Sequence, residues 1–174
     1  MLAQGPFSAN KNTFRTTRLK KRFRVIRKRL SELGLSLPAV NPPIASYVPS
    51  VRENGIVYVS GQLPLKEGQL LLTGQMIPGR SVEEAQAAMR QCFLNAVAAA
   101  LLVCNENELK RVLRLGAFVA SSAEFTEQHK VANGASDLAR EVFGDAGIHA
   151  RAAVGVSSLP LNATVELEVS FSVS

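Results

Sequence analysis

Apolar residues recur at the spacing of an α-helix in two long stretches of the chain. In residues 19–33 an apolar residue returns every three or four positions, at Leu19, Phe23, Ile26, Leu30 and Leu33, with lysine and arginine between. The second stretch runs from 82 to about 105 with a spacing of four. Ser81 before it and Glu84 in its first turn match a capping box, whose two side chains satisfy free backbone N–H groups. A further helix is predicted over residues 129–143, ending at Gly144.

Short apolar or alternating segments predict the strands. Residues 47–51 and 56–60 flank Glu53-Asn54-Gly55, where Asn and Gly tolerate the positive φ of a tight hairpin turn. Another short extended piece is expected at 69–72, and a buried strand at 112–120. Strands at 152–157 and 164–172 close the chain, the last alternating between apolar and polar residues.

This order of elements predicts an α/β (α+β) sandwich, with two helices packed on one face of a mixed β-sheet. Residues 1–34 form a basic N-terminal arm that ends in the amphipathic helix, and residues 35–174 form the domain. The uncovered face of the sheet would expose apolar residues in a monomer. We therefore expect the chain to form an oligomer.

The net charge of +6 is concentrated at the N-terminus, where residues 1–31 hold ten basic residues and no acidic one. Three interpretations of the basic helix remain open. It docks its apolar stripe on the domain, it belongs to an organelle-targeting presequence, or it binds nucleic acid or an anionic membrane. We expect a cytoplasmic protein, with a mitochondrion or another organelle as the alternative if the arm is a presequence.

Other features narrow the function by exclusion. The longest clean apolar run, residues 96–104, is too short to span a membrane. Cys92 and Cys104 are expected on one helix and too far apart to pair, as buried free thiols. Two distant histidines, His129 and His149, give no support to a metal site. Sequence signatures of serine hydrolases, nucleotide-binding loops and zinc proteases are missing.

Two charged residues near the C-terminus are the candidates for chemistry. Arg151 enters a small, apolar strand, and a guanidinium there is costly unless an anion meets it. Either it pairs internally with Glu166 or Glu168, or it is a fork-shaped donor for a ligand carboxylate or phosphate. Glu166 either faces solvent or acts as a general base or water-positioning group in a cleft.

Three segments resemble the Rid/YjgF family of imine and enamine deaminases, in particular its longer subgroup known as endoribonuclease L-PSP-like. They read YVPSVRENGIVYVSGQLP at 47–64, KVANGASDLAREVFG at 130–144, and HARAAVGVSSLP at 149–160 followed by ATVELEV. The resemblance covers the chain from about Leu30 to its end. It implies a chorismate-mutase-like fold and a homotrimer with sites between adjacent subunits.

The resemblance also implies roles for individual residues. Arg151 would hold a substrate carboxylate, and Glu166 would position the hydrolytic water. Tyr47 and the backbone at Ser60 and Gly61 would line the cleft. Asn133 matches a further cleft residue, although an apparent insertion lies nearby. His149 has no assigned role beyond that of a hydrogen-bonded structural histidine.

One departure concerns the pocket around the arginine. Archetypal members have Ser and Cys directly after it, where this chain has Ala152 and Ala153. Without the thiol the pocket loses a cleft-lining group and any redox control through it. The carboxylate clamp is retained, and the substrate preference stays open.

The resemblance thus implies hydrolysis of reactive 2-imino and 2-enamino acids, such as 2-aminoacrylate, to 2-oxo acids and ammonia, with no metal or organic cofactor. Two alternatives remain open. One is a non-catalytic binding or sensor protein for 2-oxo acids. The other is an endoribonuclease or RNA-binding protein acting through the basic arm.

Overall fold

A five-stranded mixed sheet forms the centre of the fold. The computed structural model describes residues 26–40 and 46–174. Across the sheet the strands are β1 (Ser50–Glu53), β2 (Ile56–Gln62), β7 (Val165–Val173), β5 (Leu109–Ala120) and β6 (Ala150–Val156). β5 and β6 run parallel, and the other neighbours are antiparallel. β6 is therefore an edge strand, and β7 lies in the middle.

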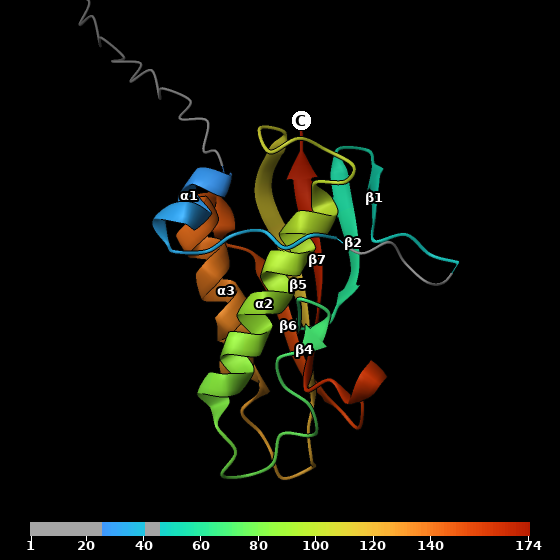
Figure 1. The fold of residues 1–174 in the computed structure, drawn as a ribbon, viewed down its shortest axis with the longest axis vertical. Coiled ribbons are helices and arrows are strands. Elements are labelled where there is room, and N and C mark those ends of the chain that lie inside the picture. The colour runs from blue at the N-terminus through green and yellow to red at the C-terminus, as the bar shows by residue number, and fades with distance from the viewer. Residues whose placement is uncertain (1–25, 41–45) are drawn as a thin grey trace, which may run out of the picture.

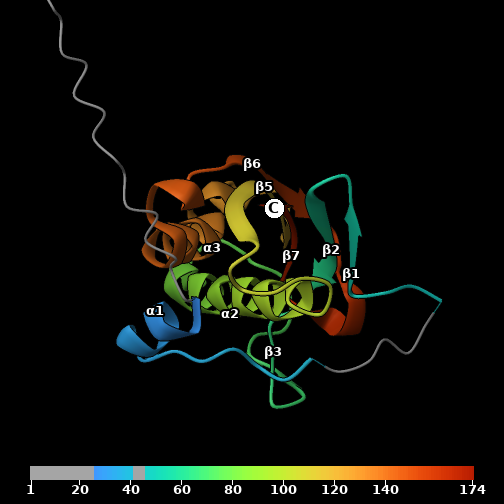
Figure 2. The ribbon, with the colours of Figure 1, turned by 90° about the horizontal axis from the view of Figure 1, so that it is seen from above.

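Two long helices, α2 (Val82–Ala100) and α3 (Gln128–Phe143), cover one face of this sheet (Figures 1 and 2). Alternate residues of β7, from Val165 to Val173, point into the core between the sheet and these helices. Glu166 and Glu168 point to the other face. The phenyl rings of Phe93, Phe143 and Phe171 meet between helices and sheet. The predicted sandwich, with two helices on one face of a mixed sheet, is confirmed.

The Ser81 cap and the Asn54-Gly55 turn form as the sequence predicts, whereas among the described residues Glu84 makes no return contact to Ser81. Ser81 is the N-cap of α2, and its hydroxyl accepts the backbone N–H of Glu84 at 3.2 Å. It is Glu83 rather than Glu84 whose carboxylate meets the serine, at 3.1 Å. Asn54 and Gly55 both have positive φ, 48° and 76°, and join β1 to β2.

The predicted end of the longest helix is wrong, and the short extended piece has its own partner. α2 ends at Ala100, not near residue 105, because the chain tightens there into turns with N–H groups bonded three residues back. Cys104 therefore lies beyond the helix, half-buried, while Cys92 is fully buried within it. The extended piece at β4 (Gln69–Leu70) does not join the main sheet; it pairs with β3 (Leu65–Lys66) as a separate ribbon.

The end of the basic helix packs on the domain. α1 (Ile26–Glu32) lies beside α3, and Ile26 and Leu30 are buried in the common core (Figure 1). Residues 1–25, including Leu19 and Phe23 of the predicted stripe, are outside the described part of the chain. None of the helices in the described part has the length and apolar character needed to cross a membrane.

Candidate functional site

Arg151 lies near the start of the edge strand β6, on the face of the sheet that carries the helices. In the parallel ladder it is the partner of Leu115, which is itself the partner of the buried Val169. Partnered residues in neighbouring strands share a face. The guanidinium consequently points towards α3, at the rim of the sheet where it remains exposed.

One nitrogen of the Arg151 guanidinium is held by two side chains of α3. Its Nη1 donates to Oδ1 of Asn133 at 2.8 Å and to Oγ of Ser136 at 3.0 Å. Among the described residues, Nε and Nη2 have no hydrogen-bond partner, and no carboxylate forms an ion pair with this arginine. Internal pairing with Glu166 or Glu168 is therefore wrong.

The Nε–Nη2 edge of an arginine is a ready site for an anion. Its two parallel N–H groups match the two oxygens of a carboxylate. The bonds from Nη1 use the opposite corner of the same group, so they orient the guanidinium and leave that edge available. This arrangement can bind a small carboxylate at the exposed rim.

Glu166 lies on the opposite face of the sheet. It is the ladder partner of Phe118, between the buried Val165 and Leu167. A bulge in β2 brings Ser60 and Gly61 opposite the single residue Glu168. A Cβ on Gly61 would lie 1.8 Å from Oε1 of Glu166, so only glycine leaves room for this carboxylate.

The surroundings of Glu166 favour its protonated form. Burial of the half-buried side chain raises its pKa, and the neighbouring Glu168 carboxylate adds to the effect. A carboxyl group with a raised pKa is better suited to accept and return a proton near neutral pH than an ordinary surface glutamate. The pKa shift is consistent with a site rather than with a freely solvated face.

Ser60 forms hydrogen bonds to the segment that follows Tyr47. Its hydroxyl donates to the carbonyl oxygen of Val48 at 2.8 Å, and its backbone N–H donates to Pro49. Tyr47 itself is 58% exposed. Gly61 thus lies next to Glu166, and Ser60 links this part of the strand to the segment that begins at Tyr47.

The predicted site residues therefore form two clusters in one chain. The arginine cluster comprises Asn133 and Arg151 together with Ser136 and His149. The glutamate cluster comprises Tyr47, Ser60, Gly61 and Glu166. Since the sheet separates Arg151 from Glu166, a single copy of the chain does not bring the two charged groups into one cleft.

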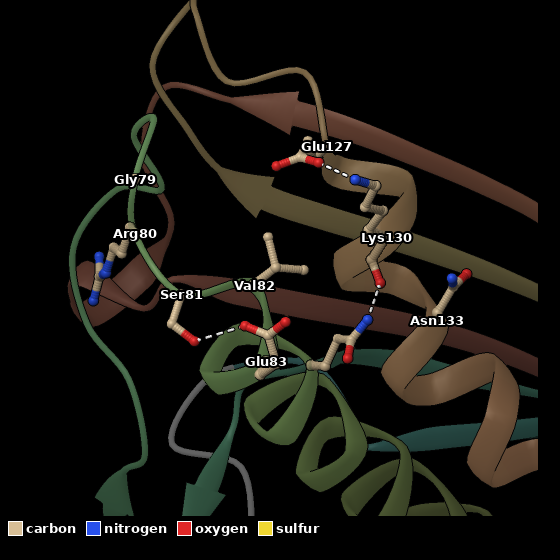
Figure 3. Close-up of a pocket in the computed structure, with 9 residues that line it drawn as sticks. Gly79, Arg80, Ser81, Val82, Glu83, Glu127, Lys130 and Asn133 are labelled. Atoms are coloured by element: carbon tan, nitrogen blue, oxygen red, sulfur yellow. Dashed lines mark hydrogen bonds and ion pairs between the residues drawn. The ribbon is translucent and has the colours of Figure 1, made fainter.

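An open pocket adjoins the arginine cluster at the N-terminal ends of α2 and α3 (Figure 3). Asn133, which holds Arg151, is one of its lining residues. Its basic groups have partners in the protein: Lys130 pairs with Glu127, which also lines the pocket, and Arg80 donates to the carbonyl oxygens of Thr73 and Gln75. The pocket can accommodate the end of a ligand remote from Arg151, and its lining is polar, with both acidic and basic side chains.

The described residues contain no group of three or more His, Cys, Asp or Glu side chains that could bind a metal ion. The two free thiols do not provide a nucleophile either. Burial raises the pKa of Cys92 well above the usual value and that of Cys104 to a smaller extent. Thiols with raised pKa values are poor nucleophiles because the thiolate is the reactive form.

Ser136 is the residue that sequence reasoning missed. It follows Asn133 by three positions, so both lie on one face of α3, and this spacing was the available signal. His149 was noted without a role; its Nε2 lies 3.0 Å from the Ser136 hydroxyl. Nothing in the spacing of 136 and 149 indicates that contact, because it depends on how β6 docks beside α3.

Comparison with known proteins agrees with this architecture. The family model described as "YjgF/chorismate mutase-like, putative endoribonuclease" matches residues 27–171. The chain is 45% identical over 141 residues to protein TCP17 of Trypanosoma cruzi, covering 80% of this chain and 88% of that protein. It is 30% identical over 134 residues to a 2-iminobutanoate/2-iminopropanoate deaminase of Dermatophagoides farinae, covering 77% and 91%.

A solved structure is similar over most of its length. The Agrobacterium tumefaciens protein Atu1372, described as having unknown function, superimposes with a TM-score of 0.80 at 43% sequence identity. The match covers 86% of this chain and 93% of that one. From the length of the family match and these relatives, the chain belongs to the Rid/YjgF family.

Proposed function

We propose that this protein hydrolyses reactive 2-imino and 2-enamino acids to 2-oxo acids and ammonia. Water adds to the imine carbon, the resulting aminol collapses, and the C–N bond breaks as ammonia leaves. An enamine such as 2-aminoacrylate first takes a proton on carbon to become the imine. The relative that is named as a 2-iminobutanoate/2-iminopropanoate deaminase supports this reaction class.

The observation that carries the proposal is the hydrogen bonding of the Arg151 guanidinium. Its Nη1 is held by Asn133 and Ser136, and its Nε–Nη2 edge has no partner among the described residues. A substrate carboxylate bound at this edge would place the neighbouring imine carbon at a defined position and orientation. Fixing the reacting carbon in this way lowers the barrier to water attack.

Glu166 is the group best suited to handle the proton of the attacking water. Its raised pKa allows it to accept that proton and return it to the leaving nitrogen. Since Glu166 and Arg151 lie on opposite faces of one sheet, we propose that the reactive cleft combines Arg151 of one copy with the glutamate cluster of a second copy.

The uncovered sheet face supports an oligomer built in this way, which we propose to be a homotrimer. Alongside Glu166 it carries the large apolar residues Val51, Tyr58 and Val154, which are between 43% and 51% exposed. A soluble oligomer gains stability by burying such a patch. Closed rotational symmetry would repeat the same composite cleft at each subunit boundary.

The decisive experiment compares the wild type with Arg151→Ala. An imino acid is generated in situ by an amino-acid oxidase, and its capture by semicarbazide is followed spectroscopically. The wild type should suppress semicarbazone formation. Arg151→Ala should lose about 100-fold in kcat/KM, because two charge-assisted hydrogen bonds together contribute about 3 kcal/mol.

Arg140→Ala is the matched control, since Arg140 is an exposed arginine of α3 outside the cluster. It should behave as the wild type. Equal suppression by wild type and Arg151→Ala would refute the arginine clamp. Absence of suppression by the wild type, with 2-oxobutanoate still bound, would favour a binding or sensor protein over an enzyme.

A further inference from the structure

A chain of hydrogen bonds runs behind Arg151, away from its open edge. Nη1 of Arg151 donates to Oγ of Ser136 at 3.0 Å. The same oxygen lies 3.0 Å from Nε2 of His149, whose Nδ1 lies 2.6 Å from the carbonyl oxygen of Gly147. Ser136 and His149 are both half-buried, in contrast to the exposed Arg151.

The chemistry of the groups gives this chain a direction. The carbonyl of Gly147 can only accept, so Nδ1 of His149 must carry a proton. In a neutral imidazole Nε2 is then an acceptor, and the Ser136 hydroxyl donates its single proton to it. The lone pairs of the Ser136 oxygen are left for Arg151. Each N–H or O–H group of this chain, from the Arg151 guanidinium to the Gly147 carbonyl, thus donates to one acceptor.

The backbone that holds His149 is packed tightly against α3. A Cβ on Gly147 would lie 2.1 Å from the carbonyl oxygen of Ala139, one turn after Ser136 on the same helix. This close approach fixes the Gly147 carbonyl, and with it the His149 ring, relative to Ser136. The three groups are therefore held by the fold rather than by flexible side chains alone.

We propose that Ser136 and His149 are positioning residues that set the plane of the Arg151 guanidinium for carboxylate binding. If Asn133 were the only acceptor of Nη1, the Arg151 guanidinium could pivot about that single hydrogen bond. The second acceptor, oriented by His149, removes that freedom and aims the Nε–Nη2 edge outward. This inference rests on the carboxylate clamp of the proposed function.

The first test reads the proton on His149 directly and needs no enzymatic activity. Nitrogen-15 spectra of the imidazole groups of the full chain distinguish the two neutral tautomers. His149→Gln identifies the His149 signals, and His129→Gln accounts for the other histidine. His149 should be the Nδ1–H tautomer, the minor form of free histidine in water. An Nε2–H tautomer would overturn the proposal.

The second test compares disruptive with conservative substitutions. Ser136→Ala and His149→Asn should weaken binding of 2-oxobutanoate and lower kcat/KM about tenfold, chiefly through KM, because one hydrogen bond behind the clamp is lost. Ser136→Thr keeps the hydroxyl, and His149→Gln places an amide oxygen near the position of Nε2. Both should stay close to the wild type, as should Asp137→Asn on the exposed side of α3.

The outcomes separate the two proposals. If the wild type binds 2-oxobutanoate without deaminating imines, and Ser136→Ala and His149→Asn weaken that binding, the positioning role holds and the proposed reaction fails. If the wild type deaminates and these variants match it in KM, with melting temperatures unchanged, the positioning role is refuted. If the wild type neither binds nor deaminates, both proposals fail.

Discussion

Gly61 shows how one missing side chain can make room for the carboxylate of Glu166, the group that we propose handles the proton. A methyl group there would lie 1.8 Å from Oε1 of Glu166 and 2.8 Å from its Cδ, both at the flexible end of the glutamate. The side chain can swing aside at small cost to the fold. The carboxylate then no longer occupies the bulge, where β2 carries two residues opposite one of β7. β-Bulges commonly aim side chains in this way next to active sites.

We therefore expect Gly61→Ala to separate activity from stability. The deaminase kcat/KM should fall on the order of 100-fold, as for loss of a general base, while the free energy of unfolding changes by about 1 kcal/mol or less. Imine trapping and urea denaturation measure the two quantities. The double variant Gly61→Ala/Glu166→Gln should lose little beyond Glu166→Gln alone. Additive losses would show that Gly61 acts independently of Glu166.

The raised pKa of Glu166 also predicts how stability depends on pH. Burial, and then Glu168, make Glu166 bind its proton more tightly in the folded than in the unfolded chain. The folded state consequently loses stability as the pH rises from the usual value of 4.5 through the raised pKa, and the loss is complete above it.

Glu166→Gln removes this loss because the amide stays neutral. The variant should melt at a higher temperature than the wild type at about pH 7, and the difference should vanish below about pH 4. Glu53→Gln, at an exposed carboxylate on β1, is the control and should follow the wild type at both pH values. A difference in melting temperature between the wild type and Glu166→Gln that does not change with pH would contradict the prediction.

At the scale of elements, α1 joins the core of the domain. Leu30 is 1% exposed and contacts the same cluster as α2 and α3, although the sequence places it in a basic arm. Any truncation that tests RNA binding by the basic segment should end before Ile26, which is also buried. Removal of residues 1–29 would delete a core side chain and confound the result.

Leu30→Ala should lower the free energy of unfolding by about 2–5 kcal/mol, since it removes a buried side chain and leaves a cavity. The neighbouring Lys28 is exposed, and Lys28→Ala should change stability by no more than about 0.5 kcal/mol. Urea denaturation of both variants measures the difference. Equal stabilities would mean that α1 does not pack on the domain in solution.

At the scale of the whole molecule, the sheet divides the site into two halves. Arg151 reaches α3 on one face, and Glu166 lies at the bulge on the other. In the composite cleft that we propose, each half comes from a different copy of the chain. Arg151→Ala and Glu166→Gln should each be nearly inactive alone, yet each contains the half that the other lacks.

Mixed oligomers of these two variants should regain activity. In a trimer that contains both variants, about a third of the subunit boundaries unite a wild-type Arg151 with a wild-type Glu166. Co-expression with two affinity tags isolates mixed oligomers for the trapping assay. Arg151→Ala mixed with the double variant Arg151→Ala/Glu166→Gln is the matched control and should stay inactive. No recovery in the first mixture would refute the composite cleft.

The sequence by itself determined the elements and most of the candidate residues. Period-two and helical spacing, the Ser81 cap and the Asn54-Gly55 turn predict local structure because these signals act between residues close in the chain. They also identify Arg151 and Glu166, since charges in otherwise apolar or alternating strands stand out. Local signals define the ends of helices less well than their centres. The predicted end of α2 is therefore about five residues too late.

Only the tertiary structure decided how those residues combine. Alternation along a strand tells which residues share a face, but not which strand lies beside it. The parallel register of β6 against β5 turns Arg151 towards Asn133 and Ser136, while Glu166 on β7 points to the other face. Contacts between residues distant in the chain, such as Ser136 with His149, arise from packing and carry no local signature.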